Sequence, residues 1–190
     1  FRRVLFRSRT GYMFACEEAG ITPDIMCLGK ALTGGMMTLA ATCASQQVFD
    51  AFLSESYETA FMHGPTYMGN PIAVAAANAS LDLFEKEPRL QQVQQIEEWL
   101  QKHLAPCRTL PNVKDVRIKG ALGVVQLKIE ANSEEEDTPL FIQLRKKFLE
   151  MGVHIRPFGD CIYLAPPFII TEAELKTLCG SIYSVLNSQN

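Results

Sequence analysis

The sequence lacks both a long apolar run and a strong excess of charge. No segment approaches the roughly 20 consecutive apolar residues of a membrane-spanning helix, and the first residues lack the apolar run of about 7 to 15 residues that a secretory signal needs. The 18 Lys and Arg side chains stand against 21 Asp and Glu, for a net charge of −3, which offers no basic field for a phosphate backbone. We therefore expect a soluble protein whose partners include neither a membrane nor a nucleic acid.

Paired cysteine motifs are also missing. The six cysteines lie far apart, without a CxxC pair and without a Cys/His cluster at the spacing of zinc ligands. Several of them fall within apolar segments, as buried free thiols commonly do. The pattern predicts no metal site and indicates a reducing compartment, the cytoplasm.

The sequence does contain enough apolar material for a core. Its 190 residues are 47% hydrophobic and 21% charged, which is typical of globular proteins and excludes global disorder. Strands and helices intermingle, so the fold class is α/β or α+β, with a domain boundary near residue 105. Apolar runs predict strands over 24–28, 36–43, 113–118, 122–129, 154–156 and 161–164, and helical periodicity predicts helices over 45–52, 71–87, 88–104, 139–151 and 172–186.

Lys30 is the first candidate for chemistry, because it is the only cation between residues 10 and 85. It follows an apolar run and precedes the Gly34–Gly35 turn. A lysine held against apolar neighbours has its ammonium form disfavoured, and the neutral amine can attack a carbonyl to form a Schiff base. A pyridoxal phosphate enzyme requires such an amine. The alternative is a lysine in an exposed turn.

The segment from His63 to Thr66 is the second candidate. It lies in a predicted long loop over 54–70. Gly64 leaves backbone N–H groups open to an anion, Thr66 adds a hydroxyl, and the helix expected from Pro71 directs its positive end toward the loop. These features suit a phosphate or a carboxylate, although a capped loop before an Ala-rich helix would have the same sequence. His63 has no second metal ligand nearby, which favours a structural role.

Arg156 is the third candidate and the only cation between Lys147 and Lys176. A guanidinium can hold a substrate carboxylate with two parallel hydrogen bonds, while neighbouring aromatic side chains shape a pocket. The alternative is a strand arginine paired with Asp160 at the surface.

These segments, in this order, resemble the class III aminotransferases of the fold type I pyridoxal phosphate family. The resemblance is carried by CLGKALTGG at 27–35, FMHGPTYMGNP at 61–71, and IRPFG at 155–159 with IYL at 162–164. It runs from about residue 9 to the C-terminus. It implies the C-terminal part of a cofactor-binding large domain with connecting helices over 9–104, and a small α+β domain over 105–190.

The resemblance implies roles for three residues toward the cofactor, pyridoxal 5′-phosphate. Lys30 would bind it covalently and move the proton between substrate and cofactor. Pro65 and Thr66 would contact the cofactor phosphate, and in this family that contact reaches the site of the neighbouring subunit in a homodimer.

For the substrates, the resemblance is to the branch of the family that acts in biotin synthesis. It implies transfer of an amino group from S-adenosylmethionine to the ketone of 8-amino-7-oxononanoate, giving 7,8-diaminononanoate. Lys30 would contact substrate, Gly64 would bind it through its backbone, and Arg156 would hold the oxononanoate carboxylate. Tyr163 is a further pocket candidate.

The start of the chain departs from the family. Residues 1–8 do not resemble it, and Phe1 stands where an acidic residue pairs with the pyridine nitrogen. Residues 10–190 alone carry a net charge of −7, because four of the 18 basic side chains fall within the first nine residues. We therefore expect 1–8 to be foreign sequence and the chain to be a truncated enzyme, inactive alone. Another class III aminotransferase, for ω-amino acids or diamines, and a non-catalytic interaction domain remain alternatives.

Overall fold

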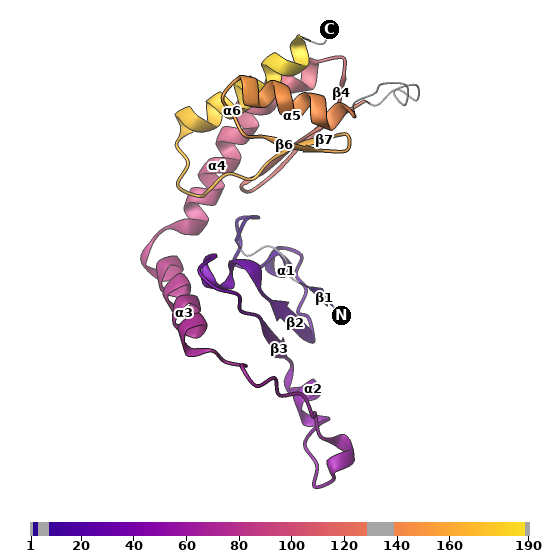
Figure 1. Ribbon diagram of the computed structural model, residues 1–190, viewed down its shortest axis with the longest axis vertical. Coiled ribbons are helices and arrows are strands. Elements are labelled where there is room, and N and C mark those ends of the chain that lie inside the picture. Colours follow the sequence, from indigo (N-terminus) through magenta and orange to yellow (C-terminus); the bar gives the residue numbers. More distant parts are fainter. Residues whose placement is uncertain (1, 4–7, 129–138, 189–190) are drawn as a thin grey trace. The chain divides into compact units, whose positions relative to one another are not determined.

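The computed structural model describes residues 2–3, 8–128 and 139–188 (Figure 1). The chain divides into two compact units: the first unit comprises residues 1–8 and 12–90, and the second unit comprises residues 9–11 and 91–190. The two units divide near the start of α4 (Arg89–Leu104), whereas the boundary expected near residue 105 lies at the end of that helix. The domain assignment stays a prediction. The sequence also predicts a loop at the acidic stretch over 134–137, which lies outside the described residues.

The first unit contains a three-stranded sheet in the order β1-β2-β3. The short β1 pairs in parallel with β2, whereas β2 and β3 are antiparallel, with Leu28 opposite Ala41. The elements are β1 (Arg2–Arg3), α1 (Ala15–Glu18), β2 (Ile25–Leu28), the 3-10 helix η1 (Lys30–Thr33), β3 (Ala41–Ala44), α2 (Gln46–Asp50), the 3-10 helix η2 (Tyr57–Thr59) and α3 (Pro71–Lys86).

The first unit's predicted helices form as expected, but β3 is shorter than the strand predicted over 36–43. Ser45 caps α2 with its hydroxyl, and Asn70 caps α3, which begins with Pro71. The strand expected over 36–43 instead begins at Ala41. Its first residues are held in the turn after η1, where Met36 N–H bonds to the Thr33 carbonyl. The glycine turn therefore delays the strand.

The second unit is built on an antiparallel four-stranded sheet in the order β4-β5-β7-β6. The strand predicted over 154–156 begins at Arg156, because the two-residue turn at Gly159–Asp160 pairs Phe158 with Cys161. The elements are α4 (Arg89–Leu104), the 3-10 helix η3 (Ala105–Thr109), β4 (Val113–Lys119), β5 (Leu122–Leu127), α5 (Leu140–Glu150), β6 (Arg156–Phe158), β7 (Cys161–Leu164) and α6 (Glu172–Asn187).

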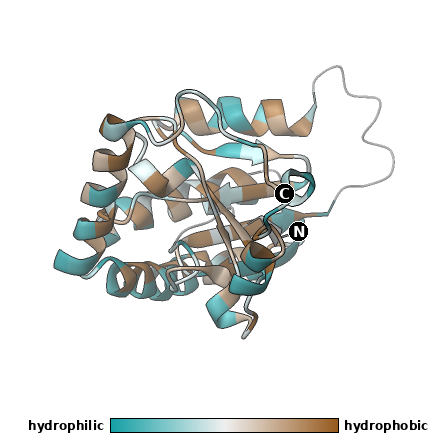
Figure 2. Ribbon diagram, turned by 90° about the horizontal axis from the view of Figure 1, so that it is seen from below, coloured by the Kyte–Doolittle hydropathy of each residue, from teal (hydrophilic) through white to brown (hydrophobic). Residues whose placement is uncertain are grey.

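One face of this sheet is covered by α4, α5 and α6, and the core of the second unit lies there. Alternate residues of β5 are buried, as expected for a strand with one covered face. In the colouring by hydropathy, α5 shows hydrophobic and hydrophilic turns side by side (Figure 2), as expected for a helix that buries one side. Fully buried side chains from all three helices and the sheet meet in one cluster, including Ile96, Leu100, Leu144, Phe148, Ile162, Leu175 and Ile182.

Segment 9–11 packs on the second unit. The Ala121 N–H donates to the Arg9 carbonyl (2.8 Å), and the Arg9 guanidinium donates to the Pro166 carbonyl (2.8 Å). Gly120 has φ +53°, and a Cβ there would lie 2.2 Å from the Arg9 carbonyl oxygen. The turn between β4 and β5 therefore needs glycine at this position, for both its conformation and its close contact with the segment.

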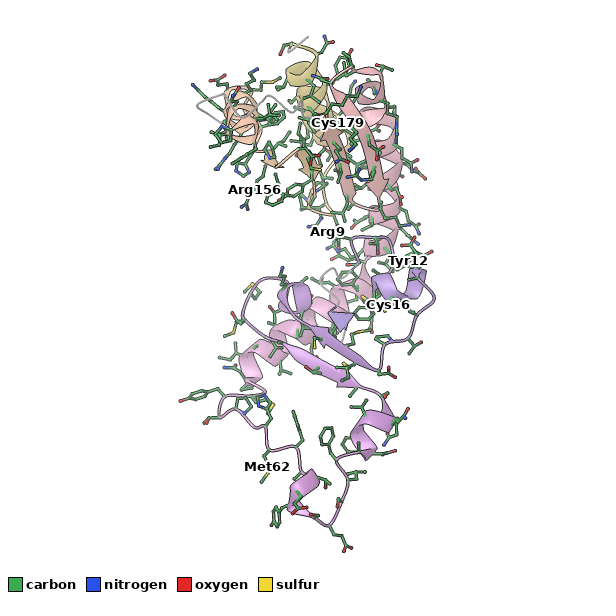
Figure 3. The ribbon with its side chains drawn as sticks, turned by 90° about the vertical axis from the view of Figure 1, so that its right-hand side faces the viewer. Arg9, Tyr12, Cys16, Met62, Arg156 and Cys179 are labelled. Atoms are coloured by element: carbon green, nitrogen blue, oxygen red, sulfur yellow. The ribbon has the colours of Figure 1, made fainter. Side chains whose placement is uncertain are left out.

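The first unit leaves most of its large apolar side chains in solvent. Its only fully or nearly buried apolar side chains among the described residues are Ala73 and Ala77 on α3. Met62 lies on the exposed loop after η2 (Figure 3). The most exposed apolar side chains include Met36, Tyr57, Phe61, Met62, Tyr67, Met68 and Ile72. In the part of the chain that the structure describes, no helix combines the length and apolar character needed to cross a membrane.

Candidate functional site

Lys30 is the first residue of η1 and is separated from the end of β2 by Gly29 alone. Its φ is +49°, a left-handed conformation that only Ser8 shares among the described non-glycine residues. Such a backbone costs a side-chain-bearing residue of order 1–2 kcal/mol. The lysine is exposed, so the expectation that apolar neighbours enclose it is wrong for this chain. The surrounding turn fixes the Lys30 backbone, and its amine is accessible.

Thr33 braces the turn that carries Lys30. It is 1% exposed, and its hydroxyl donates to the Met37 carbonyl (2.5 Å) and accepts from the Met37 N–H (3.4 Å). The Leu32 N–H also bonds to the Gly29 carbonyl (3.2 Å). The sequence reasoning missed Thr33. Its signal would have been a hydroxyl residue between the lysine and the Gly-Gly pair, because such a side chain satisfies backbone groups in tight turns.

The segment from Gly64 to Thr66 is exposed throughout. The backbone N–H groups at the start of α3 are already satisfied within the chain. Pro71 has no N–H, and the next three residues, 72–74, donate to Asn70, two to its side chain (3.0 and 3.2 Å) and one to its carbonyl (2.9 Å). What remains available to an anion is therefore the loop itself, with the Thr66 hydroxyl.

His63 lies beside an aromatic pair in the same region. Its ring centroid is 5.6 Å from that of Phe61, which in turn is 5.3 Å from that of Phe52. Within the described residues, no hydrogen bond or ion pair joins Lys30 to the segment from Gly64 to Thr66. The structure therefore does not bring these two predicted parts of a cofactor site together through a direct bond.

Arg156 and Tyr163 are brought together. They lie directly opposite one another on β6 and β7, and both are on the sheet face that the helices leave open. Cross-strand partners have Cβ atoms about 4.5–5.5 Å apart. Figure 3 shows Arg156 with its side chain among those of the second unit. The two side chains that sequence analysis placed in one pocket are therefore neighbours.

The alternative ion pair between Arg156 and Asp160 is not formed. The Asp160 carboxylate instead accepts hydrogen bonds from the Gln126 amide (2.7 Å) and the Cys161 thiol (3.2 Å). The pKa of Asp160 is lowered, and the hydrogen bond from Gln126 is the main cause. Across the residues that the structure describes, the Arg156 guanidinium has no hydrogen-bond or ion-pair partner. Arg156 is thus an unpaired cation on an open sheet face.

Arg117 on the same face shows the opposite arrangement. Its guanidinium donates to the Asp115 carboxylate (2.9 Å) and to the Gln126 carbonyl (2.6 Å). The hydrogen bond from Arg117 lowers the pKa of Asp115. Arg117 lies on β4 and Arg156 on β6, at opposite edges of the sheet, which are about 14 Å apart at the usual strand spacing. Arg117 is thus held in a hydrogen-bond network with Asp115 and Gln126, whereas Arg156 has no such partner among the described residues.

Comparison with known proteins gives a consistent family match. The family model described as aminotransferase class-III matches residues 6–186. The chain is 46% identical over 179 residues to adenosylmethionine-8-amino-7-oxononanoate aminotransferase of Buchnera aphidicola subsp. Acyrthosiphon pisum, covering 94% of this chain and 40% of that protein. The Corynebacterium glutamicum enzyme of the same name is 40% identical over 181 residues, or 95% of this chain and 41% of that protein. The chain thus spans about two fifths of the length of these relatives.

Solved structures agree with this match and confirm the predicted α/β fold class. The crystal structure of the Methanocaldococcus jannaschii enzyme of that name has a TM-score of 0.83 at 36% identity, covering 95% of this chain and 43% of that chain. An omega-transaminase from Thermomicrobium roseum has a TM-score of 0.83 at 28% identity, covering 98% of this chain and 42% of that one. Class III aminotransferases depend on pyridoxal phosphate. The chain belongs to the class III aminotransferase family.

Proposed function

We propose that this chain is the part of an adenosylmethionine-8-amino-7-oxononanoate aminotransferase that supplies the cofactor lysine and the arginine for the acceptor. The reaction would transfer an amino group from S-adenosylmethionine to 8-amino-7-oxononanoate in the cytoplasm. Relatives with this name are 37–46% identical to the chain. The observation that carries the proposal is Lys30, an accessible amine on a hydroxyl-braced turn in a left-handed backbone conformation.

The described residues fit the lysine end of a pyridoxal phosphate site. When bound, pyridoxal phosphate supplies an electron-withdrawing ring that stabilises negative charge on the substrate carbon next to the amino group. Lys30 would hold the cofactor through its Nζ and carry the proton to and from that carbon. The two bonds between Thr33 and Met37 would help to hold the turn that carries the Lys30 backbone.

The loop residues Pro65 and Thr66 would contact the cofactor phosphate of a second subunit, and Gly64 would offer its backbone to substrate. Two observations support this assignment. The segment has no bond to Lys30 of its own chain among the described residues, and the loop exposes apolar side chains that suit burial against another protein surface. The proposal therefore includes a homodimer whose two sites are each completed by the partner's loop.

Arg156 would hold the carboxylate of the oxo acid. Its unpaired guanidinium can make the two parallel hydrogen bonds that a carboxylate accepts. Tyr163, its cross-strand neighbour, would line the same pocket with a ring that is 39% exposed. Both side chains stand on a sheet, which fixes their backbone positions more firmly than a loop would.

An aminotransferase for other amines is the second candidate. Fold similarity does not separate the two candidates, because the omega-transaminase from T. roseum matches as well as the M. jannaschii enzyme by TM-score. Sequence identity favours the first, at 36% against 28%. Amino transfer from S-adenosylmethionine, but not from a simple diamine, by the full-length protein would separate them.

A labelling experiment tests the central residue. The chain is incubated with pyridoxal phosphate, reduced with borohydride and mapped by mass spectrometry. We expect the label on Lys30, with little on Lys86, an exposed lysine on α3, and loss of the main label in the Lys30→Arg variant. Equal labelling of Lys30 and Lys86 would contradict a specific cofactor lysine.

A further inference from the structure

The open face of the second unit's sheet carries two rows of side chains that run across all four strands. One row contains Asp115, Gln126, Cys161 and Phe158, and the next contains Arg117, Val124, Tyr163 and Arg156. The first row ends at the hairpin turn that holds Asp160, and the second ends at Arg156. The first row therefore lies beside the row that contains Arg156.

Gln126 stands at the centre of a hydrogen-bonded chain in these rows. Its carbonyl accepts from Arg117 (2.6 Å), and its amide donates to Asp160 (2.7 Å). Only a side chain with both an acceptor and a donor can link a guanidinium to a carboxylate in this way, and glutamine has both. A glutamate could not donate to Asp160, and a lysine could not accept from Arg117.

Asp160 is anchored at three points. Its carboxylate accepts from Gln126 (2.7 Å) and from the Cys161 thiol (3.2 Å), and its carbonyl accepts from the Leu127 N–H (2.8 Å). It is also the nearest acid in sequence to Arg156, four residues away on the same hairpin. The charge of Lys114 also lowers the pKa of Asp160, and a released Asp160 would be the acid nearest in sequence to compete with a carboxylate ligand of Arg156.

We propose that Gln126 is a positioning residue for Arg156, because its amide holds the Asp160 carboxylate and so keeps the Arg156 guanidinium free for a carboxylate ligand. The inference rests on the role proposed for Arg156. The proposal explains why Arg117 is hydrogen-bonded to neighbouring side chains on this face whereas Arg156 is not. Arg117 is neutralised within the network, and the network also occupies the acid that could neutralise Arg156.

The reaction of arginine with phenylglyoxal tests this on the chain itself, with peptide mapping to follow each site. Arg145, an exposed arginine on α5, is the internal reference. In Gln126→Leu, Asp160 is released to pair with Arg156, and we expect the Arg156 rate to fall about two- to fivefold, the range of an exposed ion pair. The double variant Gln126→Leu/Asp160→Asn should restore the rate. An unchanged rate in Gln126→Leu, or a fall that the second change does not restore, would overturn the proposal.

Two further variants keep the test decisive if Gln126→Leu does not fold. Asp160→Asn alone should leave the Arg156 rate unchanged, and an increase would show that Asp160 already pairs with Arg156. Asp115→Asn is the matched control, since it should speed the reaction of Arg117 and leave Arg156 unchanged.

The proposed role of Arg156 is tested separately with nonanoate as the probe. Protection of Arg156 in the wild-type chain supports a carboxylate site. Absence of protection would count against that site, whereas the rates in the variants without nonanoate would still decide the role of Gln126.

Discussion

The two units bury their apolar side chains to very different extents. The second unit closes a core to which helices from distant parts of the sequence and three of the four strands of its sheet, β4, β5 and β7, contribute buried residues. Among its described residues, the first unit buries only two apolar side chains, both alanines, and it leaves Phe61, Met62 and Tyr67 largely in solvent. Because apolar burial is the main favourable term in folding, the second unit has what it needs to be stable and the first unit does not.

The residues proposed to bind the acceptor carboxylate and those proposed to bind the cofactor lie on different units. Arg156 and Tyr163 stand on the unit with its own core, whereas Lys30 and Thr66 stand on the unit without one. The chain spans about two fifths of its relatives. The residues proposed for carboxylate binding therefore stand on a unit with its own core, whereas those proposed for cofactor binding stand on exposed segments.

The largest expected loss of stability comes from opening a cavity in the second unit's core. Phe148→Ala removes a fully buried ring on α5 and should lower the free energy of unfolding by about 3–5 kcal/mol. The matched control is Phe158→Ala on the exposed face, with a ring 75% exposed, which should change it by less than about 0.5 kcal/mol. Urea unfolding followed by circular dichroism measures both, and equal effects would refute the assignment of the core.

The next effect concerns the contact of segment 9–11 with the second unit. Gly120→Ala places a Cβ against the Arg9 carbonyl at positive φ and should cost about 2–3 kcal/mol. Gly159→Ala is the control, because φ is +56° but no atom lies within 4 Å, so only the conformational cost of about 1 kcal/mol remains. If thermal melting shows the same loss for both variants, the segment is not packed as described.

A smaller effect is expected in the first unit. Thr33→Val removes two hydrogen bonds to Met37, worth about 1–2 kcal/mol locally. Because this unit lacks a core, the global unfolding midpoint should not move, while the Met37 amide should exchange faster with deuterium. Thr66→Val, at an exposed loop position, should change neither quantity. A lower global midpoint in Thr33→Val would show that the two units unfold together.

The smallest effect is a loss of stability at alkaline pH. Burial raises the pKa of Cys107 to about 11 and that of Cys179 to about 12, above the ordinary value near 9. The thiols of the unfolded chain ionise at lower pH than the buried ones. The contribution of the buried thiols to the free energy of unfolding is therefore fully present below pH 9, and it falls by about 1 kcal/mol per thiol at pH 10. Urea midpoints at pH 8 and pH 10 test this, and Cys179→Ala should reduce the difference. A midpoint that rises with pH would contradict it.

Local patterns in the sequence predicted the longer helices and strands, but neither the short β1 and α1 nor every boundary. The Ala-rich run with Asn70 before Pro71 predicted α3 correctly. The strands at 36–43 and 154–156 were misplaced at their starts, because turn hydrogen bonds around Thr33 and the hairpin at Gly159 determine where pairing begins. Strand starts depend on turn chemistry as well as on apolar runs.

The candidate site was predicted residue by residue, but the interactions around it were not. The motifs singled out Lys30 and Arg156 as candidates, and of the two readings of Lys30 the structure shows the lysine in an exposed turn. Pairing of Asp160 with Arg156 was the simplest local alternative, and it fails because Gln126, 34 positions away, takes Asp160. Such long-range pairing follows from the strand order of the sheet, which a single sequence does not contain.

Hydrogen exchange of the intact chain tests the contrast between the units most directly. Amides of β5 and α6 in the second unit should exchange only through global unfolding, and those of β2 and α3 in the first unit should exchange at least about 100-fold faster, through local opening. Mass spectrometry of peptides from both units would measure this in one experiment. Equal protection in β5, α6, β2 and α3 would contradict the inference that only the second unit forms a core of its own.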